Sequence, residues 1–185
     1  MVLGEVNTLV QELEKAELEA PDGLPSAQIY AQLLAVYLYQ NDLCNAKYLW
    51  KRIPPNIKSL CPELQQIWMV GQRMWQRDWR AVHAALNNEW SDDVNSIMHA
   101  LKENVRERAM ILISEAYSSV NLSVLAAMTG LSLEQAQISA VERGWTVDGN
   151  TVKPCKVDKE QHTAQATLTE DQLYKLTEFV SFLEN

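Results

Sequence analysis

Histidine and cysteine, the residue types most used to hold metals and to act as nucleophiles, occur three times each in this sequence. They are His83, His99, His162, Cys44, Cys61 and Cys155. None of them forms an H-x-H, H-E-x-x-H or C-x-x-C pattern, so no metal ligand set is indicated. We therefore predict no metal, no cofactor and cysteines that stay reduced, as in an intracellular protein.

Carboxylate pairs are the next candidates for chemistry. Asp92-Asp93 and Glu170-Asp171 both stand where helices are expected to start, and the helix dipole favours acidic residues there. The sequence also lacks a G-x-S-x-G motif, a P-loop and a G-x-G-x-x-G motif. We expect no catalytic residue and a protein that is not an enzyme.

Arg73, Arg77 and Arg80 are spaced i, i+4, i+7, which places them on roughly one helix face. Such a trio could bind phosphate or an acidic partner, or it could be a solvated helix face. The whole chain carries a net charge of −8, which disfavours general nucleic-acid or membrane-surface binding. No apolar run approaches the ~20 residues of a membrane span, and the N-terminus lacks the basic region of a secretory signal.

The elements that must position these residues are mostly helices. Residues 5–119 show helical periodicity without strand alternation. Ser26 and Asp42 are expected to cap helices, and Pro54-Pro55 to stop one. Further helices are expected from about Glu63 to Arg77, from Trp79 to Leu86, and from Ser91 towards Tyr117.

A repeat with a period of 36 lies in this region. The segment Tyr39-Gln40-Asn41-Asp42-Leu43 aligns with Trp75-Gln76-Arg77-Asp78-Trp79, and the small residue Ala35 aligns with Gly71. This period is typical of stacked helical hairpins, with a bundle as the alternative. The tryptophans are expected in the core, or otherwise on a partner surface; they are Trp50, Trp68, Trp75 and Trp79.

Residues 120–153 have the pattern of a winged helix, with a plain helix and hairpin as the alternative. A short apolar helix ends at Gly130, and Ser132 with Gln135 forms a capping box for a second helix whose apolar face is Ala136, Ala140 and Val141. Asp148-Gly149 then predicts a hairpin turn. This segment has two basic residues, Arg143 and Lys153, and three acidic ones (Glu134, Glu142 and Asp148). The excess of negative charge disfavours DNA reading.

A polar linker, residues 154–167, precedes a last helix, residues 168–185. Leu173, Leu176, Val180 and Leu183 form a heptad-like seam that Phe179 and Phe182 widen. An isolated helix of this length is marginal, so it must dock either on its own chain or in a bundle of partner helices.

Three stretches resemble the small PCI-domain subunits of the proteasome lid, the COP-nine signalosome and an initiation-factor scaffold, with the signalosome member most similar. They are residues 41–59, 71–79 and 176–185. The resemblance implies a mainly α fold, with TPR-like helical-hairpin repeats in residues 1–119, a winged helix in 120–153 and a C-terminal bundle helix.

It also implies a non-catalytic scaffold in a hetero-oligomeric signalosome of the cytoplasm and nucleus, which acts in cullin deneddylation. The neighbour would be subunit 3, and the bundle residues would be those of the seam. The protein-binding edge of the winged helix would be Trp145, Thr146, Val147, Thr151, Val152 and Lys153. The alternative is a winged-helix nucleic-acid-binding or transcription-associated protein.

Overall fold

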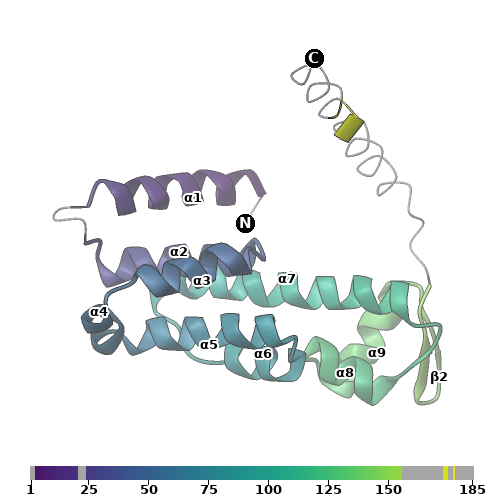
Figure 1. Ribbon diagram of the computed structural model, residues 1–185. Coiled ribbons are helices and arrows are strands. Elements are labelled where there is room, and N and C mark those ends of the chain that lie inside the picture. The colour runs from purple at the N-terminus through teal and green to yellow at the C-terminus, as the bar shows by residue number, and fades with distance from the viewer. Residues whose placement is uncertain (1–2, 21–23, 156–172, 175–176, 178–185) are drawn as a thin grey trace.

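The computed structural model describes residues 3–20, 24–155, 173–174 and 177 (Figure 1). Helices dominate this part of the chain. In order they are α1 (Leu3–Leu18), α2 (Ala27–Tyr39), α3 (Leu43–Arg52), α4 (Pro55–Leu60), α5 (Pro62–Gln76), α6 (Trp79–Leu86), α7 (Asp92–Ala116), α8 (Leu122–Thr129) and α9 (Leu133–Glu142). The strands are β1 (Val120–Asn121), β2 (Thr146–Asp148) and β3 (Thr151–Lys153). Among these helices, none is long and apolar enough to cross a membrane.

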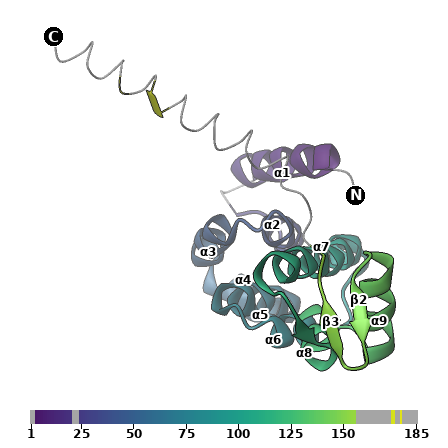
Figure 2. The same ribbon diagram turned by 90° about the vertical axis from the view of Figure 1, so that its right-hand side faces the viewer.

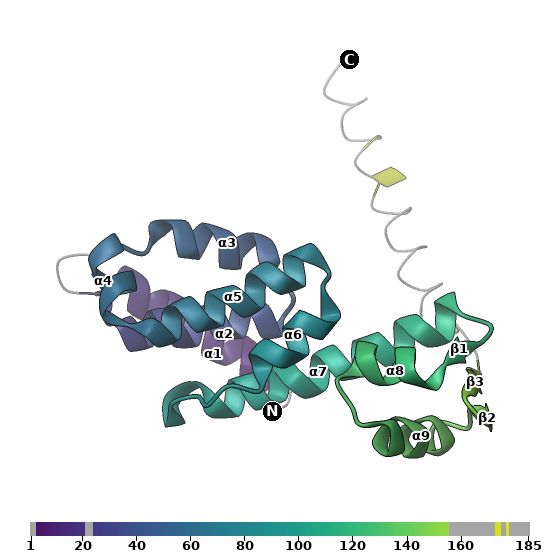
Figure 3. The ribbon, with the colours of Figure 1, turned by 90° about the horizontal axis from the view of Figure 1, so that it is seen from below.

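The α2–α3 and α5–α6 hairpins share one turn geometry. Asn41 and Arg77, 36 positions apart, both adopt the left-handed conformation, with φ of 60° and 58°. The next residue caps the following helix in each case: the carboxylate of Asp42 accepts from the Asn45 backbone at 3.0 Å, and that of Asp78 from the Ala81 backbone at 3.2 Å. The predicted repeat is therefore confirmed in its turns as well as its period (Figure 3).

Close packing of the two hairpins depends on a glycine. A Cβ atom on Gly71 of α5 would lie 3.0 Å from Cδ2 of Leu38 in α2, tighter than ordinary van der Waals contact. Leu33, Leu34 and Leu38 of α2 have no exposed surface, since α1, α3, α5 and α7 all pack around this helix. Gly71 thus permits the approach that buries α2.

Helix α7 passes through two apolar cores. Met98, Leu101 and Val105 belong to the core of the helical hairpins, whereas Met110 and Ile113 belong to the core of the winged helix. The start of α7 is held by Glu63, whose carboxylate accepts from the backbone and hydroxyl of Ser91 at 2.7 and 3.0 Å. The helix runs unbroken along the molecule and carries α8 at its C-terminal end (Figure 1).

The winged helix forms one end of the molecule (Figure 2). Gly130, at φ 66°, ends α8, and the capping box of Ser132 and Gln135 starts α9 as predicted. The hairpin strands β2 and β3 are joined by β1 in a three-stranded antiparallel sheet of order β1-β3-β2. Val120 of β1 pairs with Val152 of β3, which closes the sheet over the core.

One expectation about the hairpins is wrong and one is confirmed with an addition. Trp75 is 53% exposed, whereas Trp50, Trp68 and Trp79 pack against the core as expected, the first two stacked with ring centroids 5.3 Å apart. The expected stop at Pro54-Pro55 is confirmed, because α3 ends at Arg52, and Pro55 also occupies the first position of α4. Proline suits that position because the missing N–H is not needed there.

Candidate protein-binding surface of the winged helix

The sheet of the described residues has two outer strands, β1 and β2, of which β2 is the longer and lies beside the hairpin turn. Thr146, Val147 and Asp148 pair with β3 on one side, and among the described residues no strand lies on the other. An outer strand carries backbone N–H and C=O groups that can pair with a strand from another chain. β2 is therefore the element of the winged helix best suited to extending the sheet into a neighbour.

The prediction that both hairpin strands form the open edge needs correction. Thr151, Val152 and Lys153 form the middle strand, because β1 returns from residue 120 to pair with it. Only the β2 half of the predicted edge has an open side. The sequence pattern missed β1 because a two-residue strand has no alternation to detect.

Core contacts fix the position of the edge. Trp145 is 6% exposed, and its backbone N–H donates to the carbonyl of Ala140 in α9 at 2.9 Å. The N–H of Leu122 donates to the carbonyl of Asn150 in the hairpin turn, also at 2.9 Å. Val152 is fully buried. Trp145 and Val152 therefore hold the sheet from inside, while Thr146, Thr151 and Lys153 are exposed and Val147 is half-buried.

Helix α9 turns an apolar stripe outward next to the sheet. Leu133, Ile138 and Val141 are 53%, 58% and 59% exposed, whereas Ala136 and Ala140 are fully buried. Val141 was predicted on the inner face, which is wrong: only the i, i+4 alanine pair faces the core. The i, i+3 spacing of Ile138 and Val141 was the missed signal for a second, outward stripe.

The charges around this stripe are acidic. Glu134 and Glu142 line the shallow hollow that Ile138 and Val141 form on α9. Arg143, the basic residue that follows, turns back to α7, where Nη1 donates to Oε1 of Glu107 at 3.0 Å and Nη2 contacts Oε2. The hydrogen bond from Arg143 holds the pKa of the Glu107 carboxyl below its ordinary value. With Arg143 so engaged, the α9 surface offers phosphate little attraction.

The end of α8 is fastened to the helical hairpins by two side chains that sequence reasoning missed. Nε2 of His83 in α6 donates to the carbonyl of Met128 at 3.1 Å, and Nε of Arg106 in α7 donates to that of Thr129 at 3.3 Å. Carbonyls at a helix C-terminus lack partners within the helix, so the two bonds satisfy carbonyl groups that would otherwise be buried without a hydrogen-bond donor. Nothing in the local sequence around His83 signals a contact 45 residues away.

The environment of His83 favours the neutral form of its ring. The side chain is 4% exposed, and Nδ1 is buried without a hydrogen-bond partner. Burial lowers the pKa of His83 below its ordinary 6.5, with a smaller push from Arg106 and Lys102, while the bond to Met128 and the charge of Glu103 act the other way. The neutral ring is a structural link between the two cores.

The arginine trio does not form the predicted single face. Arg73 lies in α5, Arg77 in the left-handed turn that ends α5, and Arg80 in α6. The change of chain direction at Arg77 separates them. Arg73 donates to the side chain of Gln76 at 3.3 Å within its own helix.

The seam of the C-terminal helix falls almost wholly outside the described residues. Leu176, Phe179, Val180 and Leu183 are not described, and Leu173, which is, lies in a helical turn with 66% of its surface exposed. The bundle assignment of these residues stays a prediction. Within the described ranges, no group of three or more His, Cys, Asp or Glu side chains could hold a metal.

Helical hairpins joined through one long helix to a winged helix define a PCI-type protein. Residues 25–165 match the CSN8/PSMD8/EIF3K family, and the chain belongs to that family. It is 45% identical over 182 residues to a Xenopus tropicalis protein named COP9 signalosome complex subunit 8, covering 96% of this chain and 92% of that one. Proteins of the same name from Danio rerio and Arabidopsis thaliana are 44% and 32% identical, each over 180 residues. These alignments cover 96% and 97% of this chain, and 93% and 89% of the relatives.

Proposed function

We propose that the chain is a non-catalytic scaffold subunit of the COP9 signalosome, in the position that subunit 8 holds. The observation that carries this proposal is similarity along nearly the whole chain to proteins named for that subunit, including 35% identity over 189 residues to the Drosophila melanogaster protein. In this role the chain supports assembly of the complex that removes a ubiquitin-like modifier from cullin-RING ubiquitin ligases, in the cytoplasm and nucleus.

Two parts of the chain divide the assembly role in this proposal. The open side of β2 extends the sheet of a neighbouring subunit, which we take to be subunit 3. The segment 168–185 supplies its apolar seam to the helical bundle shared by the other subunits. The support for the first part is the strand order, and for the second the i, i+3, i+7 spacing of Leu173, Leu176 and Val180.

A scaffold role also fits the chemistry of the surface. The winged helix has an apolar stripe bordered by Glu134 and Glu142 and a neutralised Arg143, a combination suited to protein contacts. The alternative of nucleic-acid binding has less support, because the arginine trio is dispersed over two helices and a turn.

The test uses the full chain, tagged and expressed in cells of its source, with mass spectrometry of what co-purifies. A triple variant, Leu176→Ala, Val180→Ala and Leu183→Ala, removes the seam. A matched triple variant, Thr177→Ala, Glu178→Ala and Glu184→Ala, changes the same segment off the seam. We expect signalosome subunits with the wild type and the matched variant, and their loss with the seam variant. Normal assembly of the seam variant would contradict the bundle role, and absence of signalosome subunits from the wild type would contradict the proposal.

A further inference from the structure

A groove lies between the two helical hairpins, far from the winged helix. Its volume is about 270 Å³, and it is lined by Leu38, Leu43, Ala46, Lys47, Trp68, Gly71, Gln72, Trp75 and Gln76. The floor is apolar, with Leu38, Ala46 and Gly71 among the lining residues. Small-molecule sites usually exceed about 300 Å³ and are more enclosed, so this groove suits one or two side chains of a bound peptide.

The walls of the groove combine a cation with an exposed aromatic ring. Nζ of Lys47 lies 4.7 Å from the ring centroid of Trp75, which is 53% exposed. A second cation has the same arrangement nearby, since Nζ of Lys58 lies 4.7 Å from the Trp50 ring that stacks on Trp68. A tryptophan half in solvent with an ammonium group over it is typical of interface anchors rather than of core packing.

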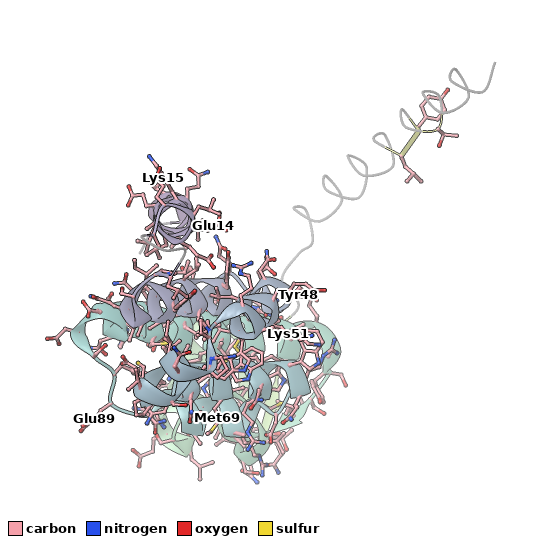
Figure 4. All side chains as sticks on the ribbon, turned by 60° about the vertical axis from the view of Figure 1, so that its left-hand side comes forward. Glu14, Lys15, Tyr48, Lys51, Met69 and Glu89 are labelled. Atoms are coloured by element: carbon pink, nitrogen blue, oxygen red, sulfur yellow. The ribbon has the colours of Figure 1, made fainter. Side chains whose placement is uncertain are left out.

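The surface around the groove extends this character. Lys51 lies one turn beyond Lys47 on α3, and Tyr48 and Met69 are 60% and 47% exposed. Figure 4 shows Tyr48 and Lys51 together on α3, with Met69 of α5 on the same side of the molecule. An exposed Tyr on α3 and an exposed Met on α5, two of the helices that line the groove, add apolar contact area to this surface.

The charge of this region is opposite to that of the rest of the chain. From Leu43 to Gln76 the sequence has five basic residues and one acidic residue, while the whole chain carries −8. The acidic residue, Glu63, is turned to Ser91 at the start of α7. Arg52 is paired with Glu17 at 2.8 Å and Arg73 donates to Gln76 at 3.3 Å, and Lys47 is the cation that lines the groove itself. A positive region on an acidic protein attracts acidic partners selectively.

We propose that this groove, the Lys47–Trp75 groove, is a docking site for an acidic segment of another protein. A bulky apolar side chain of the segment fills the groove and packs against Trp75, and flanking carboxylates pair with Lys47 and Lys51. The inference goes beyond the signalosome assignment, since it depends on the groove and its charges and not on β2 or on the C-terminal helix.

Nucleic acid fits this site less well than an acidic peptide does. A single strand tracks a continuous cationic path, whereas here the cations sit at one apolar hollow on a chain of net charge −8. The apolar floor that includes Leu38 and Leu43 also gains more binding free energy from burying an apolar side chain than from a sugar or a phosphate.

The test titrates the full chain with a capped synthetic peptide in which a central Leu-Phe pair is flanked on both sides by Glu and Asp residues. Tryptophan emission and calorimetry report binding. We expect Lys47→Glu and Trp75→Ala each to weaken binding by roughly tenfold or more. The control Lys15→Glu makes the same charge change on α1, where Lys15 is 71% exposed and away from α3 (Figure 4). It should change affinity by no more than about twofold, because distant exposed charges are screened.

Other probes separate the causes of binding. A peptide with Ala in place of the Leu-Phe pair should bind at least about tenfold more weakly, and one with Lys in place of the acidic residues should not bind. The proposal is overturned if no binding is seen up to roughly millimolar peptide, if Lys15→Glu weakens binding as much as Lys47→Glu, or if a single-stranded oligonucleotide binds the groove as tightly as the peptide. Circular dichroism of each variant must match the wild type, and Lys47→Gln provides a milder variant if Lys47→Glu does not fold.

Discussion

The ring of His83 occupies the space that a side chain on Gly130 would need. A Cβ atom built on Gly130 would lie 2.4 Å from Cγ of His83 and 2.7 Å from its Nδ1. This contact joins α6 of the helical hairpins to the turn between α8 and α9. Gly130 and His83, far apart in the sequence, together form one close contact, called here the His83–Gly130 joint.

The joint predicts unequal costs for two glycine substitutions. Gly130 and Gly144 both have positive φ, 66° and 73°, but a Cβ on Gly144 meets nothing within 4 Å. Gly144→Ala should lower the free energy of unfolding by about 1 kcal/mol, the cost of the left-handed conformation. Gly130→Ala should lower it by a further 1–3 kcal/mol or so, from overpacking against His83. Urea denaturation measures both, and equal losses would show that the contact is not tight.

His83 predicts a pH dependence of stability. Because its folded pKa is lowered, the unfolded chain binds a proton at His83 near pH 6.5 while the folded chain does not. The contribution of neutral His83 to the free energy of unfolding is fully present above pH 6.5. It is lost as the pH falls below 6.5, by at most about 1.4 kcal/mol per pH unit. His83→Gln should flatten the stability profile below about pH 6.5. A His83→Gln profile as steep as that of the wild type would refute this.

The repeated left-handed turns predict a stabilising substitution. Arg77 carries a Cβ atom in a conformation that favours glycine, so Arg77→Gly should raise the free energy of unfolding by about 1 kcal/mol. Asn41→Gly should gain less, because asparagine tolerates this conformation. Gln72→Gly, within α5, should instead cost about 1 kcal/mol. Thermal melting of the three variants tests the ranking, and no gain for Arg77→Gly would contradict it.

The open side of β2 predicts which backbone amides a neighbouring subunit protects from hydrogen exchange. Backbone amides of β2 that point away from β3 should exchange hydrogen quickly in the free chain and slowly once a strand from a partner pairs with them. Amides of β3 should be protected in both states, because β1 and β2 flank this strand. Hydrogen-exchange mass spectrometry of the free chain and of the assembled complex makes the comparison. Unchanged exchange across residues 145–149 on assembly would exclude pairing at β2.

Much of the fold could be predicted from local sequence signals. The caps at Ser26, Asp42 and Ser132 and the stop at Gly130 were correct, because each is decided within one helical turn. The period of 36 was also visible, since Asp42 and Asp78 perform the same capping in both hairpins.

The site could be predicted less well, because it depends on distant partners. β1 is two residues long and exists only through its pairing with β3, about thirty positions later. The partner of Arg143 could not be predicted, because only the fold brings Glu107 of α7 beside it. Trp75 reads as core by residue type, but it lines the groove with 53% of its surface exposed. Tertiary packing, which the sequence encodes only indirectly, decides each of these cases.

Because α7 is one unbroken helix, it couples the orientation of the winged helix to that of the helical hairpins. Met98 and Leu101 clamp one end among the hairpins, and Met110 and Ile113 carry the other core. The helix has no break between these two pairs of residues about which one core could rotate against the other. A neighbour that turns the sheet therefore also turns the Lys47–Trp75 groove, so that each attachment at one end fixes the direction in which the other end points.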